Sequence, residues 1–338
     1  MTQRDTNNLD HQRKLVAILR VLAQEARPLG STELSRKLDE LGIDLGERMI
    51  RNYLLQSDRV GLTKNLGRRG RMITEKGRKE LEVAVIIDKV GFVNSRIDEL
   101  AYRMDFDDES MTGTVILNIS TIKTFHIKQT LDEFARVMNV RLGMGRFFQL
   151  GYPGQTIQNN KIPKQHLAVG TICSVTLNGI LLKHGIGMTS RFGGLLEMKE
   201  NAPVRFSQII NYDGTTIDPI EIFIKGKMTS VQKVVQTGTG SIGASFREIP
   251  AASLDDAINI IEKLQRIGLG GVLMVGKPNR PLLDIPVGMG RVGLIVAAGL
   301  NPVAALEENG LVTTSRALSS LCDFSQLQPI ESISTERV

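Results

Sequence analysis

Two neighbouring groups of basic and amide side chains in the first quarter of the chain have the chemistry needed to contact a nucleic acid. The first group recurs at helical spacing, where arginine can pair with guanine and asparagine or glutamine with adenine in the major groove. The second surrounds two glycines between short extended runs, as expected for a hairpin that lays positive charge along a phosphate backbone. The candidate DNA-contacting residues are Arg48, Arg51, Asn52, Gln56, Lys64, Arg68, Arg69 and Arg71.

Three short helices and the hairpin would position these side chains, together forming a winged helix-turn-helix over residues 11–82. A capping box of Asp44 and Glu47 would begin the third helix near Leu45, and this is the expected recognition helix. On that helix we expect four residues to pack inward: Met49, Ile50, Tyr53 and Leu54. The alternative is a small helical domain whose polar side chains are merely solvated.

The positive charge is concentrated in this same segment. Residues 1–82 hold 17 Lys and Arg against 12 Asp and Glu, whereas the remaining 256 residues hold 25 against 24. A basic module joined to a nearly neutral body suggests one part that binds a polyanion and another with a different role. A solvated basic face would also explain the charge alone, and the hairpin does not separate DNA from RNA.

A chain of 338 residues is too long for one ordinary domain. We expect a disordered N-terminus over residues 1–10, the winged helix over 11–82, a regulatory domain over 83–325 and a polar tail over 326–338. A helix after Thr74 would lead out of the first module, as a linker, as a dimer contact or as a packing element of the next domain.

The second part alternates short β-branched runs with glycine-rich turns, so its fold class is α/β or α+β. Helices are expected over residues 127–139 and after Ser253. Strands are expected over residues 114–120, 170–177, 219–225 and 292–298.

A faint internal repeat indicates two similar halves in the second part. Residues 170–179 align with residues 290–299 at a constant offset of 120, giving halves of about 111–230 and 231–325. Two similar halves that face each other would form a cleft suited to a small ligand. Coincidence in a glycine-rich chain is the alternative.

Residues 238–243 satisfy the spacing G-x-G-x-x-G but do not predict a dinucleotide site. Pro250 follows before a helix of useful length could form, so no helix N-terminus would receive a pyrophosphate. A glycine-rich turn that holds a smaller anion with Ser241, Ser245 and Arg247 is more consistent with the residues. An ordinary structural turn is the alternative.

No catalytic constellation or metal-ligand spacing emerges from the four histidines or from Cys173 and Cys322, so we expect no enzymatic activity and no cofactor. Cys173 is either a core residue or the wall of a polar pocket. The lack of a signal peptide or a membrane-spanning apolar run predicts a cytoplasmic protein without a membrane partner.

The sequence resembles the NrpR family of transcriptional repressors of nitrogen assimilation. The resemblance covers residues 11 to about 325, and its later segments are more specific than the winged helix, which occurs in many proteins. The segments that carry it are residues 11–20, 73–77, 91–96, 170–176, 179–186, 190–194 and 238–249.

The resemblance implies a repressor that binds a palindromic double-stranded operator as a homo-oligomer, in the simplest case a dimer, and releases it when 2-oxoglutarate occupies the regulatory domain. Such a ligand needs guanidinium groups and hydroxyl or backbone donors. The candidate ligand-binding residues are Thr171, Cys173, Ser174, Arg191, Ser241, Ser245 and Arg247. Either arginine could instead pair with Glu197 or Glu248. The competing hypothesis is a metabolite-binding domain or enzyme that uses the winged helix as a protein or RNA adaptor.

Overall fold

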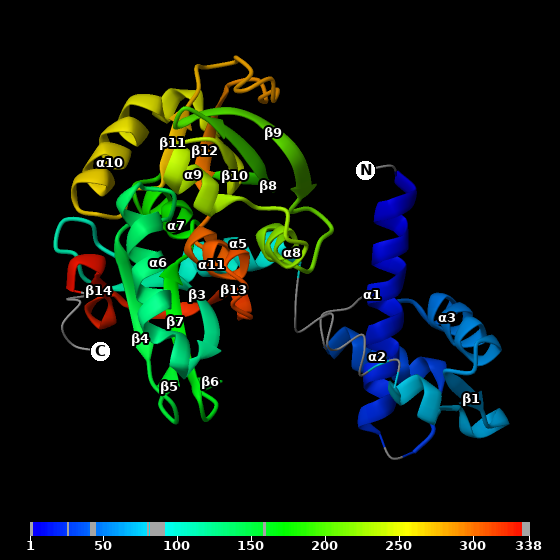
Figure 1. Ribbon diagram of the computed structural model, residues 1–338. Helices are drawn as coiled ribbons and strands as arrows, with labels where there is room; N and C mark the ends of the chain where they lie inside the picture. Colours follow the sequence, from blue (N-terminus) through cyan, green and yellow to red (C-terminus); the bar gives the residue numbers. More distant parts are fainter. Residues whose placement is uncertain are drawn as a thin grey trace. The chain divides into compact units, whose positions relative to one another are not determined.

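The chain divides into two compact units, Met1–Gly91 and Phe92–Val338. The computed structural model describes residues 3–25, 27–40, 45–79, 81, 92–157 and 160–332 (Figure 1). The prediction of a helical winged-helix module followed by a larger mixed α/β domain is confirmed. No helix in these described ranges is long and apolar enough to cross a membrane.

Among its described residues, the first unit contains the three helices α1 to α3, a two-stranded hairpin and a helical segment after Thr74. Its core is formed by leucines and isoleucines that recur every three or four residues, such as Leu34 and Leu38 on the second helix. The hairpin strands pair in antiparallel register, with Lys64 opposite Met72. The elements are α1 (Gln3–Gln24), α2 (Ser31–Glu40), α3 (Glu47–Arg59), β1 (Thr63–Asn65), η1 (Gly67–Arg69) and β2 (Arg71–Ile73).

The boundaries of this unit differ from the expected ones at two places. Helix α1 begins at Gln3, so most of the segment expected to be disordered, residues 1–10, continues the first helix. Helix α3 begins at Glu47 with Gly46 at its N-cap, two residues after the predicted start, and Asp44 of the predicted capping box lies outside the described residues. Helical structure also follows Thr74, over residues 75–79.

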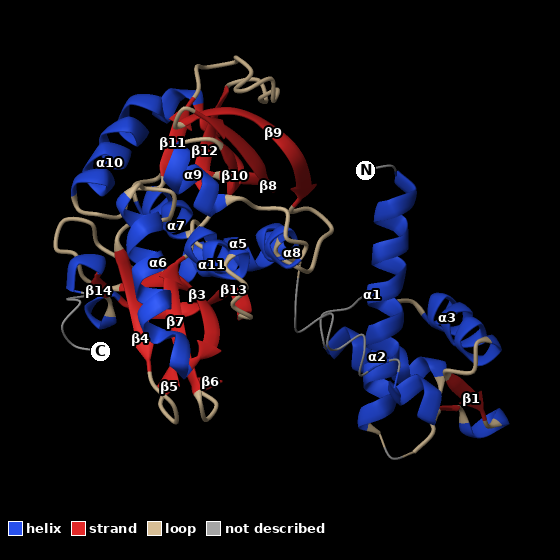
Figure 2. Cartoon of the chain, viewed as in Figure 1, coloured by secondary structure: helices blue, strands red, loops and turns tan. Residues whose placement is uncertain are grey.

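The second unit contains two five-stranded antiparallel sheets. Figure 2 draws their strands in red. The first sheet has the order β13-β3-β7-β4-β14, with β13 (Thr314–Asp323), β3 (Thr114–Lys123), β7 (His166–Ile172), β4 (Phe147–Gly151) and β14 (Gln328–Pro329). The second has the order β11-β12-β10-β8-β9, with β11 (Val272–Val275), β12 (Arg291–Ala297), β10 (Gly240–Pro250), β8 (Thr189–Lys199) and β9 (Ala202–Asn211). A small hairpin adds β5 (Thr156–Ile157) and β6 (Asn160–Lys161).

Helices pack on both sheets of this unit. Phe134 and Val137 of α6 pack in one apolar cluster with Val169 of the first sheet, whereas Ala257 and Leu264 of α10 belong to a second cluster. The helices are α5 (Val93–Arg103), α6 (Ile127–Asn139), α7 (Thr176–Lys183), α8 (Pro219–Lys225), α9 (Val231–Thr237), α10 (Leu254–Arg266) and α11 (Asn301–Glu308). Short 3-10 turns are η2 (Thr124–His126), η3 (Ala251–Ser253), η4 (Phe324–Gln326) and η5 (Ile330–Ser332).

The unit contains the same order of elements twice. The two copies align at a residue offset that differs from the predicted one. The run β3, α6, β4, β7, α7, β8 is matched by β10, α10, β11, β12, α11, β13. Leu117 lies opposite Ile172 in the first sheet and Ala244 opposite Ala297 in the second, so the offset is 127 residues on one strand and 125 on the other. The predicted offset of 120 is wrong because it aligned glycines rather than strand positions.

A matched pair of side chains supports this register. Thr176 Oγ1 at the start of α7 accepts a hydrogen bond from Ile116 N (3.1 Å) and donates to Ile116 O (3.3 Å). Asn301, which lies 125 residues later at the start of α11, bonds Gly243 N and O at 2.9 Å each, and Gly243 lies 127 residues after Ile116. In both halves a polar side chain therefore links the helix start to the same strand position.

Two predicted strands and the predicted tail are wrong in part. Residues 219–225 form α8, because Asp218 caps the helix at Ile220 N and a proline occupies its first turn. The predicted strand 170–177 ends at Ile172 and gives way to α7. Residues 326–332 of the expected tail belong to the fold, since β14 pairs with β4 and Ile330 is buried.

Candidate nucleic-acid interface and ligand site

Helix α3 presents most of the predicted recognition residues on its exposed face. Ile50, Tyr53 and Leu54 are buried in the core of the first unit, which turns the remaining positions outward. The predicted residues that are exposed there are Arg48, Arg51, Asn52 and Gln56. Met49 is 47% exposed, so the prediction that it packs inward is wrong.

The two arginines of α3 differ in how far their donors are already used. Arg51 pairs with Glu47 one turn earlier (Nη2 to Oε2, 2.9 Å) and donates from Nε to Ser31 Oγ (3.1 Å). Within the described ranges, no acidic side chain pairs with Arg48. Arg48 is therefore the more available guanidinium for a base or a phosphate.

The wing carries its charge at the tip, and the strand residue that directly follows the tip is bonded to the segment before α2. Lys64, Arg68 and Arg69 are exposed, and no described acidic residue pairs with them. Just after the tip, Leu29 N donates to Arg71 O (3.0 Å) and Arg71 N donates to Leu29 O (2.9 Å). Gly70 has a φ of +101°, and a Cβ there would lie 2.3 Å from the Leu29 carbonyl oxygen, so the tight approach requires glycine.

Arg71 does not belong with the exposed basic residues. Its side chain is 16% exposed, and its Nε pairs with Asp58 Oδ2 at 2.8 Å. Asp58 also accepts a hydrogen bond from Thr63 Oγ1 (2.6 Å), so the pair joins α3 to both strands of the wing. The Nε donor of Arg71 therefore has a structural role, and contact of Arg71 with DNA stays a prediction.

Four of the seven predicted ligand residues come together around one fully buried arginine. Arg247 on β10 donates from Nε to Ser245 Oγ (3.1 Å), from Nη1 to Ser174 O (2.7 Å) and from Nη2 to Ser174 Oγ (2.6 Å). Its Nη1 also donates to Asn178 Oδ1 of α7. Four of its five N–H donors thus already have protein acceptors, which leaves little for a ligand to bind.

Burial shifts the pKa values of the groups around Arg247. Burial raises the pKa of Cys173 to about 11 and also raises that of Tyr212. Burial, followed by repulsion from the Glu221 carboxylate, raises the pKa of Asp218 to about 6. Burial lowers the pKa of Arg247. Cys173 is consequently a neutral thiol near neutral pH, and it belongs to an apolar core cluster, the first of the two expected alternatives.

The other three predicted ligand residues lie elsewhere. Arg191 pairs with Glu248, which is also 3.8 Å from Arg291 Nε, as one of the two alternative pairings had anticipated. Ser241 N donates to Ser230 Oγ (2.7 Å) near the beginning of β10, and Thr171 is buried within β7. The predicted glycine-rich turn is wrong, because residues 240–243 are the first part of a strand in the second sheet.

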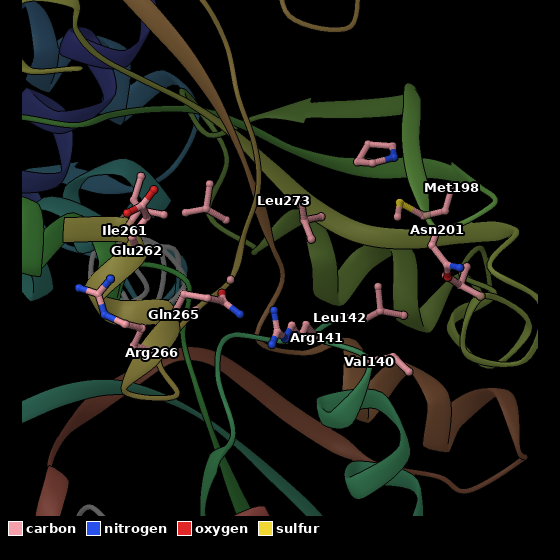
Figure 3. Close-up of a pocket in the computed structure, with 15 residues that line it drawn as sticks. Val140, Arg141, Leu142, Met198, Asn201, Ile261, Glu262, Gln265, Arg266 and Leu273 are labelled. Carbon is pink, nitrogen blue, oxygen red and sulfur yellow. The ribbon is translucent and has the colours of Figure 1, made fainter. Parts of the chain in front are cut away.

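An open cleft lies at a place that the sequence reasoning missed, where the loops after α6 and α10 meet (Figure 3). It consists of two adjoining hollows of about 570 and 390 Å³ that share Arg141, Gln265, Arg266 and Gly270. Arg146 and Asn139 complete the polar lining of the smaller hollow. Both volumes fall in the range of small-molecule sites.

Contacts between the two halves build this cleft. When the amide oxygen of Gln265 faces Arg141, this oxygen accepts hydrogen bonds from Arg141 Nη1 (2.9 Å) and Arg141 Nε (3.2 Å). Figure 3 shows the two side chains pointing toward each other. Arg146 N donates to Gly268 O (2.9 Å), which joins the two loops directly. Gly145 has a φ of +87°, and a Cβ there would lie 2.5 Å from Gly268 O.

Arg141 is the one sequence signal that could have revealed the cleft. It has a φ of +59° just after α6, at the position where the second half has Gly268 with a φ of +83° just after α10. Glycine adopts this left-handed conformation without steric cost, whereas arginine does not. Only a repeat aligned at an offset of 127 would show arginine replacing that glycine.

In the described part of the chain, no three His, Cys, Asp or Glu side chains gather into a metal-binding group.

Comparisons with known protein families assign both units. The family model described as NrpR regulatory domains NRD1 and 2 matches residues 90–329. The model described as the ribonuclease R winged-helix domain matches residues 16–81.

Individual proteins match over nearly the whole chain. The global nitrogen regulator NrpRI of Methanosarcina mazei is 33% identical over 322 residues, which cover 94% of this chain and 98% of that protein. The global nitrogen regulator NrpR of Methanococcus maripaludis is 32% identical over 313 residues, and the match covers 93% of this chain but 54% of that protein. A solved nitrogen repressor-like protein from Methanococcus jannaschii has a TM-score of 0.61 at 25% identity, covering 71% of this chain and 99% of that chain.

Proposed function

Because the chain belongs to the NrpR regulatory-domain family, as its sequence predicted, we propose that it is a DNA-binding transcriptional repressor of nitrogen assimilation genes. The relatives are named as regulators rather than enzymes, which agrees with the expectation of no enzymatic activity. The protein acts in the cytoplasm without a cofactor of its own.

The exposed basic residues of the first unit are the observation that supports DNA binding most directly. Arg48 on α3 and Arg68 and Arg69 on the wing are exposed and have no acidic partner among the described residues. Such guanidinium groups gain most from a phosphate or a guanine edge, because no internal ion pair must first be broken. In this proposal α3 lies in the major groove and the wing contacts the adjoining backbone.

A palindromic operator bound by a homodimer, and its release by 2-oxoglutarate, complete the proposal. Two copies of α3 and the wing would contact two half-sites whose spacing is set by a contact between regulatory domains. 2-Oxoglutarate would favour the released state. A preference of about 1.4 kcal/mol changes operator affinity tenfold.

The test is a fluorescence-anisotropy titration of the full chain against a palindromic duplex from its own upstream region, at fixed salt, with and without millimolar 2-oxoglutarate. Glutarate, which lacks the keto group, and a single-stranded RNA are the controls. We expect tight binding to the duplex that 2-oxoglutarate weakens and glutarate does not. Equal affinity for a scrambled duplex or for the RNA would reject the operator-binding repressor in favour of an adaptor role.

Two single variants connect the affinity to the assigned surface. Arg48→Ala and Arg69→Ala are each expected to weaken duplex binding by roughly 1 to 3 kcal/mol for a base contact and less for a phosphate contact. Arg103→Ala, whose side chain is 60% exposed and paired with Glu99 on α5, is the matched control and should bind like the unaltered chain. If all three bind equally, the assigned surface is wrong even when the duplex itself is bound.

A further inference from the structure

We propose that the end of the first sheet formed by the η2 turn and the loop before β7 binds single-stranded nucleic acid. The inference goes beyond the proposed function, because it concerns the second unit and a different form of nucleic acid. This surface, called the η2 patch below, consists of Lys123, Phe125, His126, Lys128, Lys161, Lys164 and His166.

The charge of this part of the second unit has one sign. Residues 134–196 contain seven Lys and Arg and no Asp or Glu, although residues 83–338 as a whole are nearly neutral. The acidic residues just before that stretch, Asp132 and Glu133, lie in α6, and Glu133 is buried. The η2 patch is therefore a local positive surface on a body without excess charge.

The lysines of the η2 patch are available to a polyanion. All four are exposed, and within the described ranges no acidic side chain pairs with them: Lys123, Lys128, Lys161 and Lys164. A phosphate backbone that binds such ammonium groups releases its condensed counterions, and no internal ion pair has to be broken first.

Backbone contacts bring the two segments of the η2 patch together. Lys123 lies opposite His166, where β3 ends and β7 begins. Thr124 N, next in the chain, donates to Gln165 O (2.9 Å), which places the η2 turn beside the segment that carries Lys164. The β5–β6 hairpin, which supplies a further lysine, leads into this same segment at the end of the first sheet (Figure 1).

An exposed aromatic pair lies among these lysines. Phe125 is 74% exposed, although phenylalanine is usually buried. Its ring lies against the ring of His126, with 4.0 Å between the centroids and 42° between the planes. Lys123 Nζ is 5.9 Å from the Phe125 centroid. The patch thus combines a ring on which a base can stack with ammonium groups beside it for the backbone.

This combination favours a single strand over other polyanions. In a duplex the bases are stacked on one another, so an exposed phenylalanine gains no base face there, whereas unpaired bases stack readily on aromatic side chains. A membrane surface would require an apolar face of several side chains beside the lysines, and the η2 patch contains one phenylalanine.

Fluorescence anisotropy of the full chain with a labelled deoxythymidine strand of about 20 nucleotides tests the stacking residue. We expect salt-dependent binding that is weaker than binding to the operator duplex. Phe125→Ala should weaken it at least about fivefold, which corresponds to about 1 kcal/mol for one stacked base, and Phe125→Trp should retain it. Tyr102→Ala, at an 82% exposed aromatic residue of α5, is the matched control and should bind like the unaltered chain.

The same titration at several salt concentrations tests the lysines. Lys123→Gln and Lys164→Gln should each reduce the magnitude of the slope of log K against log salt by about 0.7, the value for one phosphate of a single strand. Lys233→Gln, at an exposed lysine of α9, should leave the slope unchanged. Melting temperatures equal to that of the unaltered chain show that any loss is not due to unfolding.

The outcomes separate the η2 patch from the winged helix. Arg48→Ala and Arg69→Ala should leave single-strand binding unchanged. If these two abolish it, if the patch variants have no effect on it, or if no single strand binds, the patch is overturned whatever the operator duplex does. If patch variants weaken duplex and single-strand binding equally, the surface is a general phosphate contact and the single-strand assignment is overturned. If single-strand binding depends on Phe125 and no operator is bound, the patch stands and the repressor proposal fails.

Discussion

The arginine of the Arg247 cluster and the arginines of the cleft share a side chain and differ in how their donors are used. Arg247 is completely buried, and two serines and Asn178 accept its hydrogen bonds. Arg141 and Arg266 are exposed at the ends of two helices, and Arg141 has a partner across the cleft in Gln265. The first arrangement holds elements together, whereas the second leaves charge available to a ligand.

The same difference exists within the winged helix. Arg71 is tied to Asp58 and joins the wing to α3, whereas Arg69 lies two residues earlier at the exposed tip. Residue type and position in the sequence do not separate these two arginines. The presence of an internal partner does, and it decides whether a substitution should affect stability or binding.

The largest expected effect is on stability, in Arg247→Gln. Glutamine cannot reach the acceptors at Ser174 and Asn178, so buried polar atoms lose their partners, and we expect the free energy of unfolding to fall by about 3 kcal/mol. Arg266→Gln, at an exposed position, should change it by less than about 0.5 kcal/mol. Urea denaturation of both variants measures the difference. Equal losses would mean that Arg247 is not the structural arginine of the pair.

The second effect separates the two arginines of the winged helix. Arg71→Gln breaks a partly buried ion pair and should lower the free energy of unfolding of the first unit by about 1.5 kcal/mol. Arg69→Gln should leave stability within about 0.5 kcal/mol and reduce the salt dependence of DNA binding by the equivalent of about one phosphate contact. Thermal melts and anisotropy titrations at several salt concentrations give both quantities. A stability loss in Arg69→Gln would remove the distinction.

The third effect is a pH dependence beside Arg247. The pKa of Asp218 is raised to about 6, whereas an unfolded aspartate titrates near 3.9. Between these values the folded chain holds a proton that the unfolded chain has lost, so Asp218 lowers stability as the pH rises from about 4 to 6. Asp218→Asn can still cap α8 and lacks this titration.

Denaturation of this variant and of the unaltered chain at pH 3.5, 5 and 7 measures the difference. The variant should gain stability relative to the unaltered chain as the pH rises, with most of the change complete by pH 7. Parallel curves would show that Asp218 is not desolvated in solution.

Periodicity in the sequence predicts the elements whose two faces differ clearly. Residues 127–139 were expected to be a helix and form α6 with those bounds, because their apolar residues recur every three or four positions. The same method misread α8, in which isoleucines dominate a short segment of seven residues. A β-branched composition favours a strand, but Asp218 and the following proline start a helix and override that preference.

The candidate sites were predicted unevenly for a related reason. Exposed residues on α3 and the wing follow from one local pattern, since their neighbours are buried nearby in the sequence. Whether Arg71 or Arg247 faces a partner depends on Asp58 or Ser174, which come from other elements. The cleft requires loops about 125 residues apart to meet, and no local pattern contains that information.

The final strand of each half belongs to the sheet of the other half, which bears on how the protein is made. β13 comes last in the repeat order, yet it pairs with β3, with Thr314 opposite Thr121. β8 closes the first half in sequence and pairs with β10 of the second. During translation the first sheet must therefore wait for nearly the whole chain to leave the ribosome before its edge is covered. For the same reason, we expect separately expressed halves to be recovered as aggregates when alone and to fold together when produced side by side.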